Sequence, residues 1–222
     1  MHSLPLPLAL TARLLPVAVL ASAGWALTSG PFAPAPTAQH KPTQKTATES
    51  PTAPSTSAAT KTYASAPAPC GAVPEKTVTS LVPGTKAAGK EIASTDKSAR
   101  RTCSWNALKG YDYRWLDVSY EISDTDKAAQ KTFEQRTTEK SGGGAVPGLG
   151  DEGYSVVNLT TEDKQQTREG VVMARVSNAL VTVTYNGSDF ETQKAPSTDE
   201  INKGAIKAAK AAVAALEDGQ KA

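Results

Sequence analysis

The chain has 222 residues, a formal net charge of +2 and 39% hydrophobic residues. The basic excess lies before Cys70, because from that residue onward 20 Lys and Arg face 21 Asp and Glu. A nucleic-acid-binding domain presents a basic surface, so this balance argues against a nucleic acid as partner. The short basic pair Arg100-Arg101 is better explained as a solvated turn.

The N-terminus carries an export signal. Residues 14–27 form an uncharged apolar run behind Arg13. Fourteen residues are few for a bilayer core of about 30 Å, but they suit the hydrophobic region of a signal peptide. Ala21-Ser22-Ala23 offers a cleavage site, whereas Pro16 interrupts the run and leaves an uncleaved anchor as the alternative. We therefore predict that residues 1–27 are a signal peptide or a signal anchor, and the only contact with a membrane.

A linker follows the signal. Residues 28–69 contain eight Pro, nine Thr, ten Ala and five Ser. Such a segment cannot bury enough apolar surface to offset the entropy of ordering it, so we expect it to be disordered. A Pro-rich chain of this length could hold a domain up to about 130 Å from its starting point. The remaining residues, 70–222, are enough for one hydrophobic core and form the predicted extracytoplasmic domain.

The first half of this domain predicts a helix and several strands. A short helix spans residues 74–82 and ends at the breaker pair Pro83-Gly84. A weak strand lies near residues 91–93, and another begins at Thr102. The clearest strand covers residues 111–122, with apolar and polar side chains in strict alternation.

The second half continues with a helix from Asp124 or Thr125 to about Lys140, and Phe133 is its one large apolar residue. Strands are expected over residues 154–160, 170–176 and 179–185, with turns at Ser177-Asn178 and Asn186-Gly187. A capping box at residues 197–200 begins a C-terminal helix with an alanine-rich stripe. This order predicts an α+β fold, in which helices pack on an antiparallel sheet.

Cys70 and Cys103 are the only cysteines. An isolated pair behind an export signal indicates one structural disulfide in an oxidising compartment. Closing this loop stabilises a domain by about 3–4 kcal/mol. A redox dithiol is the alternative, but it normally uses a C-x-x-C spacing. Trp105 shares a strand face with Cys103 and is expected to pack against the bridge.

Catalytic motifs are weak. His2 and His40 lie in the leader and the linker, so residues 70–222 hold no histidine for a Ser-His-Asp triad or a zinc site. Residues 148–153 match G-x-G-x-x-G, yet a strand follows where phosphate binding needs a helix. Asp151 and Glu152 are better explained as a polar turn that caps local amides. We expect no cofactor, no metal and no enzymatic activity.

One feature points to binding. Tyr111, Tyr113 and Trp115 alternate on the face opposite the apolar residues of their strand. A row of rings can stack on sugars or anchor a protein, so cell-wall glycan and an envelope protein are the candidate partners. The alternatives are that the second helix covers this face or that a bulge switches the register of the strand.

Four segments carry a resemblance to a family. They are Cys70 with its short helix, Cys103-Ser104-Trp105, residues 146–152 (VPGLGDE) and residues 172–176 (VMARV). This pattern resembles the small secreted or lipid-anchored domains of unknown function that are common in actinobacteria. The resemblance implies a compact sheet with packed helices, and it transfers no catalytic residue. Many such domains carry a lipid-anchoring cysteine near the N-terminus, which this chain lacks.

We therefore expect an exported, extracytoplasmic domain, secreted or anchored, that acts as a non-enzymatic binding module of the cell envelope. A secreted hydrolase that works without histidine and an accessory ectodomain of a membrane complex are the alternatives.

Overall fold

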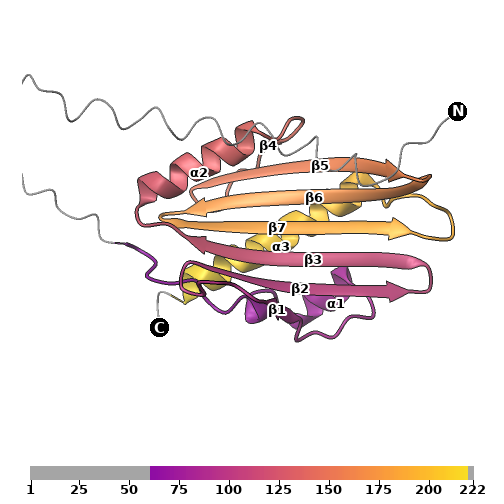
Figure 1. Ribbon diagram of the computed structural model, residues 1–222, viewed down its shortest axis with the longest axis horizontal. Helices are drawn as coiled ribbons and strands as arrows, with labels where there is room; N and C mark the ends of the chain where they lie inside the picture. Colours follow the sequence, from indigo (N-terminus) through magenta and orange to yellow (C-terminus); the bar gives the residue numbers. More distant parts are fainter. Residues whose placement is uncertain (1–60, 220–222) are drawn as a thin grey trace, which may run out of the picture. The chain divides into compact units, whose positions relative to one another are not determined.

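A computed structural model describes residues 61–219 of the chain, so the predicted signal and most of the predicted linker lie outside the described part. Its elements in chain order are a 3-10 turn, η3 (Pro69–Gly71), α1 (Glu75–Leu81), β1 (Lys90–Ile92), β2 (Arg100–Lys109), β3 (Asp112–Ile122), α2 (Asp126–Thr138), β4 (Gly144–Ala145), β5 (Glu152–Glu162), β6 (Gln165–Val176), β7 (Ala179–Asp189) and α3 (Thr198–Asp218). The strands form one antiparallel sheet in the order β1-β2-β3-β7-β6-β5-β4 (Figure 1). The predicted α+β fold is confirmed.

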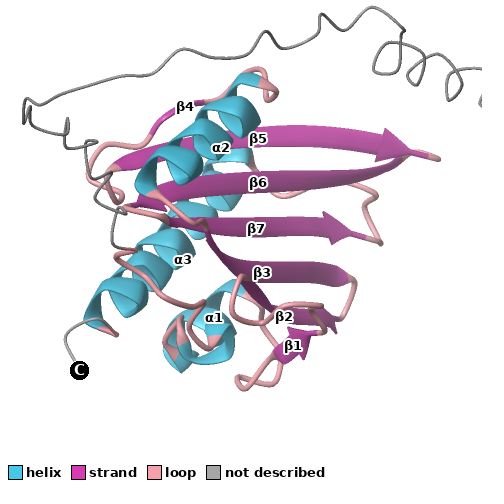
Figure 2. Ribbon diagram, turned by 60° about the vertical axis from the view of Figure 1, so that its left-hand side comes forward, coloured by secondary structure: helices cyan, strands magenta, loops and turns pink. Residues whose placement is uncertain are grey.

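The two faces of the sheet are covered unequally. The long helix α3 and the short helix α1 pack on one face and bury the main hydrophobic core. Helix α2 lies on the opposite face (Figure 2) and closes a smaller core over β5, β6 and β7. Strand β3 shows how the alternating sequence divides these faces, since its four aliphatic-face residues are buried: Leu116, Val118, Tyr120 and Ile122.

Helix α3 packs very close to the sheet. A side chain on Gly204 would place its Cβ 2.6 Å from the ring of Tyr185, so only glycine fits at this point of the helix. The buried phenols of Tyr120 and Tyr185 donate hydrogen bonds to the carbonyls of Ala212 and Leu81, each at 2.8 Å. Burial raises the pKa of both phenols above its usual value.

Both predicted helix caps are present, but one is modified. The Thr125 hydroxyl accepts the Ala128 amide at the start of α2, and the Ser197 hydroxyl accepts the Glu200 amide at the start of α3. In a full capping box the Glu200 side chain would return to the Ser197 amide. Here its carboxylate instead accepts a hydrogen bond from Arg114 of β3, which ties the helix start to the sheet.

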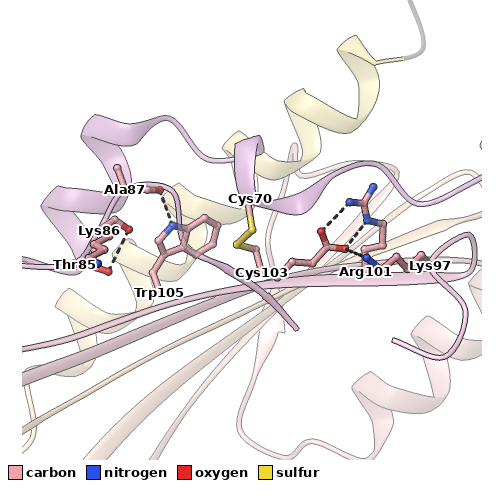
Figure 3. The surroundings of a disulfide bond; sticks show 9 residues. Cys70, Thr85, Lys86, Ala87, Lys97, Arg101, Cys103 and Trp105 are labelled. Atoms are coloured by element: carbon pink, nitrogen blue, oxygen red, sulfur yellow. Dashed lines mark hydrogen bonds and ion pairs between the residues drawn. A yellow bond between two sulfur atoms is a disulfide. The ribbon is translucent and has the colours of Figure 1, made fainter. Parts of the chain in front are cut away.

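The predicted disulfide joins Cys70 to Cys103, with the Cα atoms 5.1 Å apart. Trp105 lies beside it (Figure 3), fully buried, and its indole donates to the Ala87 carbonyl at 2.8 Å. The loop before β1 crosses both groups at Gly89, where an added Cβ would lie 2.5 Å from the indole nitrogen and 2.7 Å from the Cys103 sulfur. The predicted packing of Trp105 against the bridge is confirmed.

The packed chain begins earlier than the expected boundary at Cys70. Tyr63 and Ala66 belong to the main core. The fully buried side chain of Asn178 accepts the Tyr63 amide at 2.8 Å and donates to the Tyr63 carbonyl at 2.9 Å. Residues 61–69 are rich in Pro and Ala, so composition assigns them to the linker. Composition does not reveal that the single aromatic residue, Tyr63, is buried or that its backbone pairs with Asn178.

The turn expected at Asn186-Gly187 is wrong, because both residues continue β7 and pair with Trp115 and Arg114 of β3. Gly187 is needed for close approach here. A Cβ would lie 2.9 Å from both the Arg114 guanidinium and the Pro196 ring. Arg100-Arg101, expected in a turn, instead begins β2, and Arg101 forms a two-point hydrogen-bonded ion pair with Glu91 of β1.

Replacing both cysteines by serine should lower the free energy of unfolding by about 3–4 kcal/mol, because the unfolded chain regains the entropy of a 33-residue loop. A urea titration monitored by circular dichroism measures this loss. Wild-type protein treated with a reductant under denaturing conditions should refold to the stability of the variant. An unchanged urea midpoint in the double variant would show that the bridge contributes nothing.

Asn178→Ala should lower the free energy of unfolding by about 2–3 kcal/mol, because it leaves the buried Tyr63 amide without a partner. The Tyr63 amide should also exchange with deuterium faster than in the wild type. Asn158→Ala, at an exposed position of β5, is the matched control and should change stability by less than about 0.5 kcal/mol. Equal effects of the two substitutions would contradict the role assigned to Asn178.

Candidate binding site on the open face of the sheet

Helix α2 covers only part of its face of the sheet. Ala129 and Phe133 of α2 pack on side chains from three strands, namely Val156, Val171, Met173 and Leu180. No helix of residues 61–219 lies on the rest of this face, over β2, β3 and the distal half of β7 (Figure 2). We call this uncovered area the open face.

Three aromatic rings lie together at the distal end of the open face. Tyr113 and Trp115 point from β3, with ring centroids 6.3 Å apart in an edge-to-face arrangement. Phe190, just after β7, places its ring 6.1 Å from that of Tyr113 and is 49% exposed. We name Tyr113, Trp115 and Phe190 the aromatic strip. Its rings are partly accessible, as a stacking surface requires.

Amide side chains flank the strip. Strand pairing puts Asn106 of β2 and Asn186 of β7 directly opposite Trp115, one on each side. Continuing across the sheet, Asn186 pairs with Glu169 and Glu169 with Asn158. Residues directly opposite in a sheet point to the same face, so an indole lies within a row of amides and a carboxylate. We call these five residues the amide row.

A polar groove of about 340 Å³ continues from the strip toward α2. Its floor includes four hydroxyl residues, namely Thr102, Ser119, Thr182 and Thr184. Its charged lining comes from Arg100, Asp117, Glu121, Arg136, Lys140 and Glu169. The groove is joined to the strip because the Trp115 indole donates a 2.7 Å hydrogen bond to Asp117.

Charge is distributed along the groove. At the α2 end, Arg136 donates to both carboxylate oxygens of Glu121, at 2.9 and 3.0 Å. At the strip end, burial and the nearby Asp117 carboxylate raise the pKa of Tyr113, so its phenol stays protonated at neutral pH. The neutral phenol can donate a hydrogen bond to a ligand.

The glycine loop, residues 148–153, forms a turn and lacks the helix that phosphate binding requires. Gly148 and Gly150 have positive φ, and strand β5 begins at Glu152, where a phosphate site would need a helix. Asp151 accepts the Ser177 amide at 2.7 Å and pairs with Arg175 at 3.0 Å. Asp151 therefore holds the distant turn between β6 and β7, and the expected capping of local amides is replaced by this long-range contact.

Within residues 61–219, no group of three or more His, Cys, Asp or Glu side chains is placed to hold a metal ion. In the same residues no helix has both the length and the apolar content needed to cross a bilayer.

The structure brings together two of the three predicted aromatic residues. Tyr113 and Trp115 are half-buried on the open face, whereas Tyr111 lies in the turn before β3 and is 58% exposed. No pattern in the sequence marks Phe190, Asn106 or Asn186 as residues of this site. Asn186 is followed by Gly187, and because Asn-Gly is typical of a hairpin turn, the predicted strand ends at residue 185. A predicted strand that continued through Asn186 would place this residue opposite Trp115.

No protein-family model matches the chain, and no curated protein is similar to it at a significant level. Two solved structures show partial overlap at 11% identity. One is a protein from Bacteroides thetaiotaomicron, with a TM-score of 0.34 over 54% of this chain, which spans about half (47%) of that protein. The other is the extracellular domain of PknH from Mycobacterium tuberculosis, with a TM-score of 0.37 over 70% of this chain and 99% of that domain. At these values the functional proposal rests on this chain's own residues.

Trp115→Ala should cost only about 1 kcal/mol of unfolding free energy, because the ring is only partly buried and makes an edge-to-face contact with Tyr113. Trp105→Ala, in the core, should cost about 3–5 kcal/mol. Urea titrations of both variants compare these values. A loss for Trp115→Ala as large as that for Trp105→Ala would make the indole a core residue and remove it from the candidate site.

Proposed function

We propose that this protein is an exported, extracytoplasmic binding module of the cell envelope, without enzymatic activity, whose open face binds glycan. The observation that carries the proposal is the amide row: an accessible indole with an asparagine on each side. The disulfide supports an oxidising compartment, and the resemblance to exported actinobacterial domains is part of the same hypothesis.

The chemistry of the open face suits a sugar. The faces of pyranose rings carry C–H groups that stack on aromatic rings, while their hydroxyls need donors and acceptors around the edge. Trp115 offers the ring, Asn106 and Asn186 lie opposite it on the two neighbouring strands, and Glu169 lies one strand further on, opposite Asn186. Among the described residues, none forms a hydrogen bond with the side chain of Asn106 or Asn186, so a ligand would displace no protein partner there. A largely apolar protein partner would leave these polar groups unsatisfied, at a cost in affinity.

Binding is tested by titrating the purified chain with an N-acetylglucosamine tetramer and following Trp fluorescence. We expect saturable binding that Trp115→Ala weakens about 30-fold, equivalent to about 2 kcal/mol for a central aromatic contact. Leu159→Ala removes an exposed apolar side chain from β5 and is the control, with affinity unchanged. Equal affinities of wild type and Trp115→Ala would contradict the proposal. Binding of an envelope protein in place of glycan, again lost in Trp115→Ala, would reassign the face to a protein partner.

A further inference from the structure

The groove beside the aromatic strip holds more positive charge at one end than its own carboxylates neutralise. Arg100 and Arg136 lie at the α2 end with the single carboxylate of Glu121, which is opposite Arg100 in the strand register and accepts from Arg136. Lys140, just after α2, also lines the groove. Arg136 is paired with Glu121. None of the ion pairs formed among residues 61–219 includes Arg100 or Lys140, so two cations remain available for a ligand.

Hydroxyl groups stand between these cations. Thr102 of β2 donates to the Ser119 hydroxyl of β3 at 2.9 Å, and the Ser119 proton is then free to point into the groove. Thr182 and Thr184 of β7 continue the floor. A carboxylate accepts well from such a set, because hydrogen bonds and ion pairs to an ionised acceptor are about twice as strong as those between neutral groups.

The opposite end of the groove has the opposite charge. Asp117 lies four residues before Glu121 on β3, about 13 Å away along the strand, and Glu169 of β6 lines the groove two strands from β3, in the row of Trp115 and Asn186. Both would repel an anion but would accept hydrogen bonds from sugar hydroxyls. The groove therefore orients a ligand, with its acidic group toward α2 and its hydroxyls toward Trp115.

We propose that the groove is the subsite of an acidic glycan: one sugar stacks on the aromatic strip and the carboxylate of a neighbouring sugar is held by Arg100 and Lys140. This inference rests on the proposed function, since the strip supplies the stacking contact. It adds the class of ligand, which is a carboxylated polysaccharide and not a neutral one. It also names two residues, Arg100 and Lys140, that select for the carboxylate.

Calorimetric titrations of the full chain with a glucuronic acid tetramer and with a glucose tetramer test the proposal. The acidic tetramer should bind at least tenfold more tightly at low salt, and this preference should shrink as salt is added. Arg100→Gln combined with Lys140→Gln should remove the preference and leave binding of the neutral tetramer unchanged. Lys207→Gln, on the exposed side of α3, is the control for a change in net charge and should keep the preference.

Equal binding of the two tetramers, or a preference that survives the double substitution, would overturn the inference. Binding of the neutral tetramer that depends on Trp115 would then leave the proposed function standing. Acidic binding that depends on Arg100 and Lys140 but ignores Trp115→Ala would instead support the carboxylate subsite and refute the role of the strip. A glycerol phosphate oligomer bound more tightly than the uronate would refute the assignment to a carboxylate. Amide shifts of Ser119, Thr182 and Thr184 in NMR spectra locate the ligand in each case.

Discussion

The close approach of α3 to the sheet determines which side chains of the sheet are buried in the main core. Gly204 lets the helix backbone reach Tyr185, and the alanines of α3 keep the rest of the contact short. One face of the sheet is thereby filled by a single long helix, with α1 beside it. In the described part of the chain the other face receives only the thirteen-residue α2, which leaves a broad polar surface without a helix.

That division explains why β3 has two different roles. Its even-numbered residues from Leu116 to Ile122 are buried under α3. A substitution that shortens one of these side chains removes part of the hydrophobic core. Its odd-numbered residues pass from rings at Tyr113 and Trp115 through Asp117 and Ser119 to Glu121, on the open face. One strand thus carries both the hydrophobic anchor of the fold and the graded chemistry of the candidate site.

Much of this arrangement is predictable from the sequence, since local patterns decide it. Strict alternation in β3, the Thr125 cap and the alanine stripe each specify one element, and the isolated cysteine pair specifies one long-range contact. The missed features depend on residues distant in sequence. Gly187 belongs to a strand because Arg114 and Pro196 need its space, and Asn178 is buried because it pairs with the backbone of Tyr63. Phe190 joins the strip only through the ring of Tyr113.

The disulfide also sets a path for mechanical load. When the chain is pulled from its N-terminal side, tension beyond the Tyr63 contacts reaches Cys70 and passes directly through the sulfur–sulfur bond to Cys103. The intervening residues, with α1 and β1, then lie in a closed covalent loop and bear no tension. The force enters the sheet in the middle of β2, where ten residue pairs with β3 share it in parallel. The domain can therefore be stretched from its N-terminal side without unravelling from its first helix.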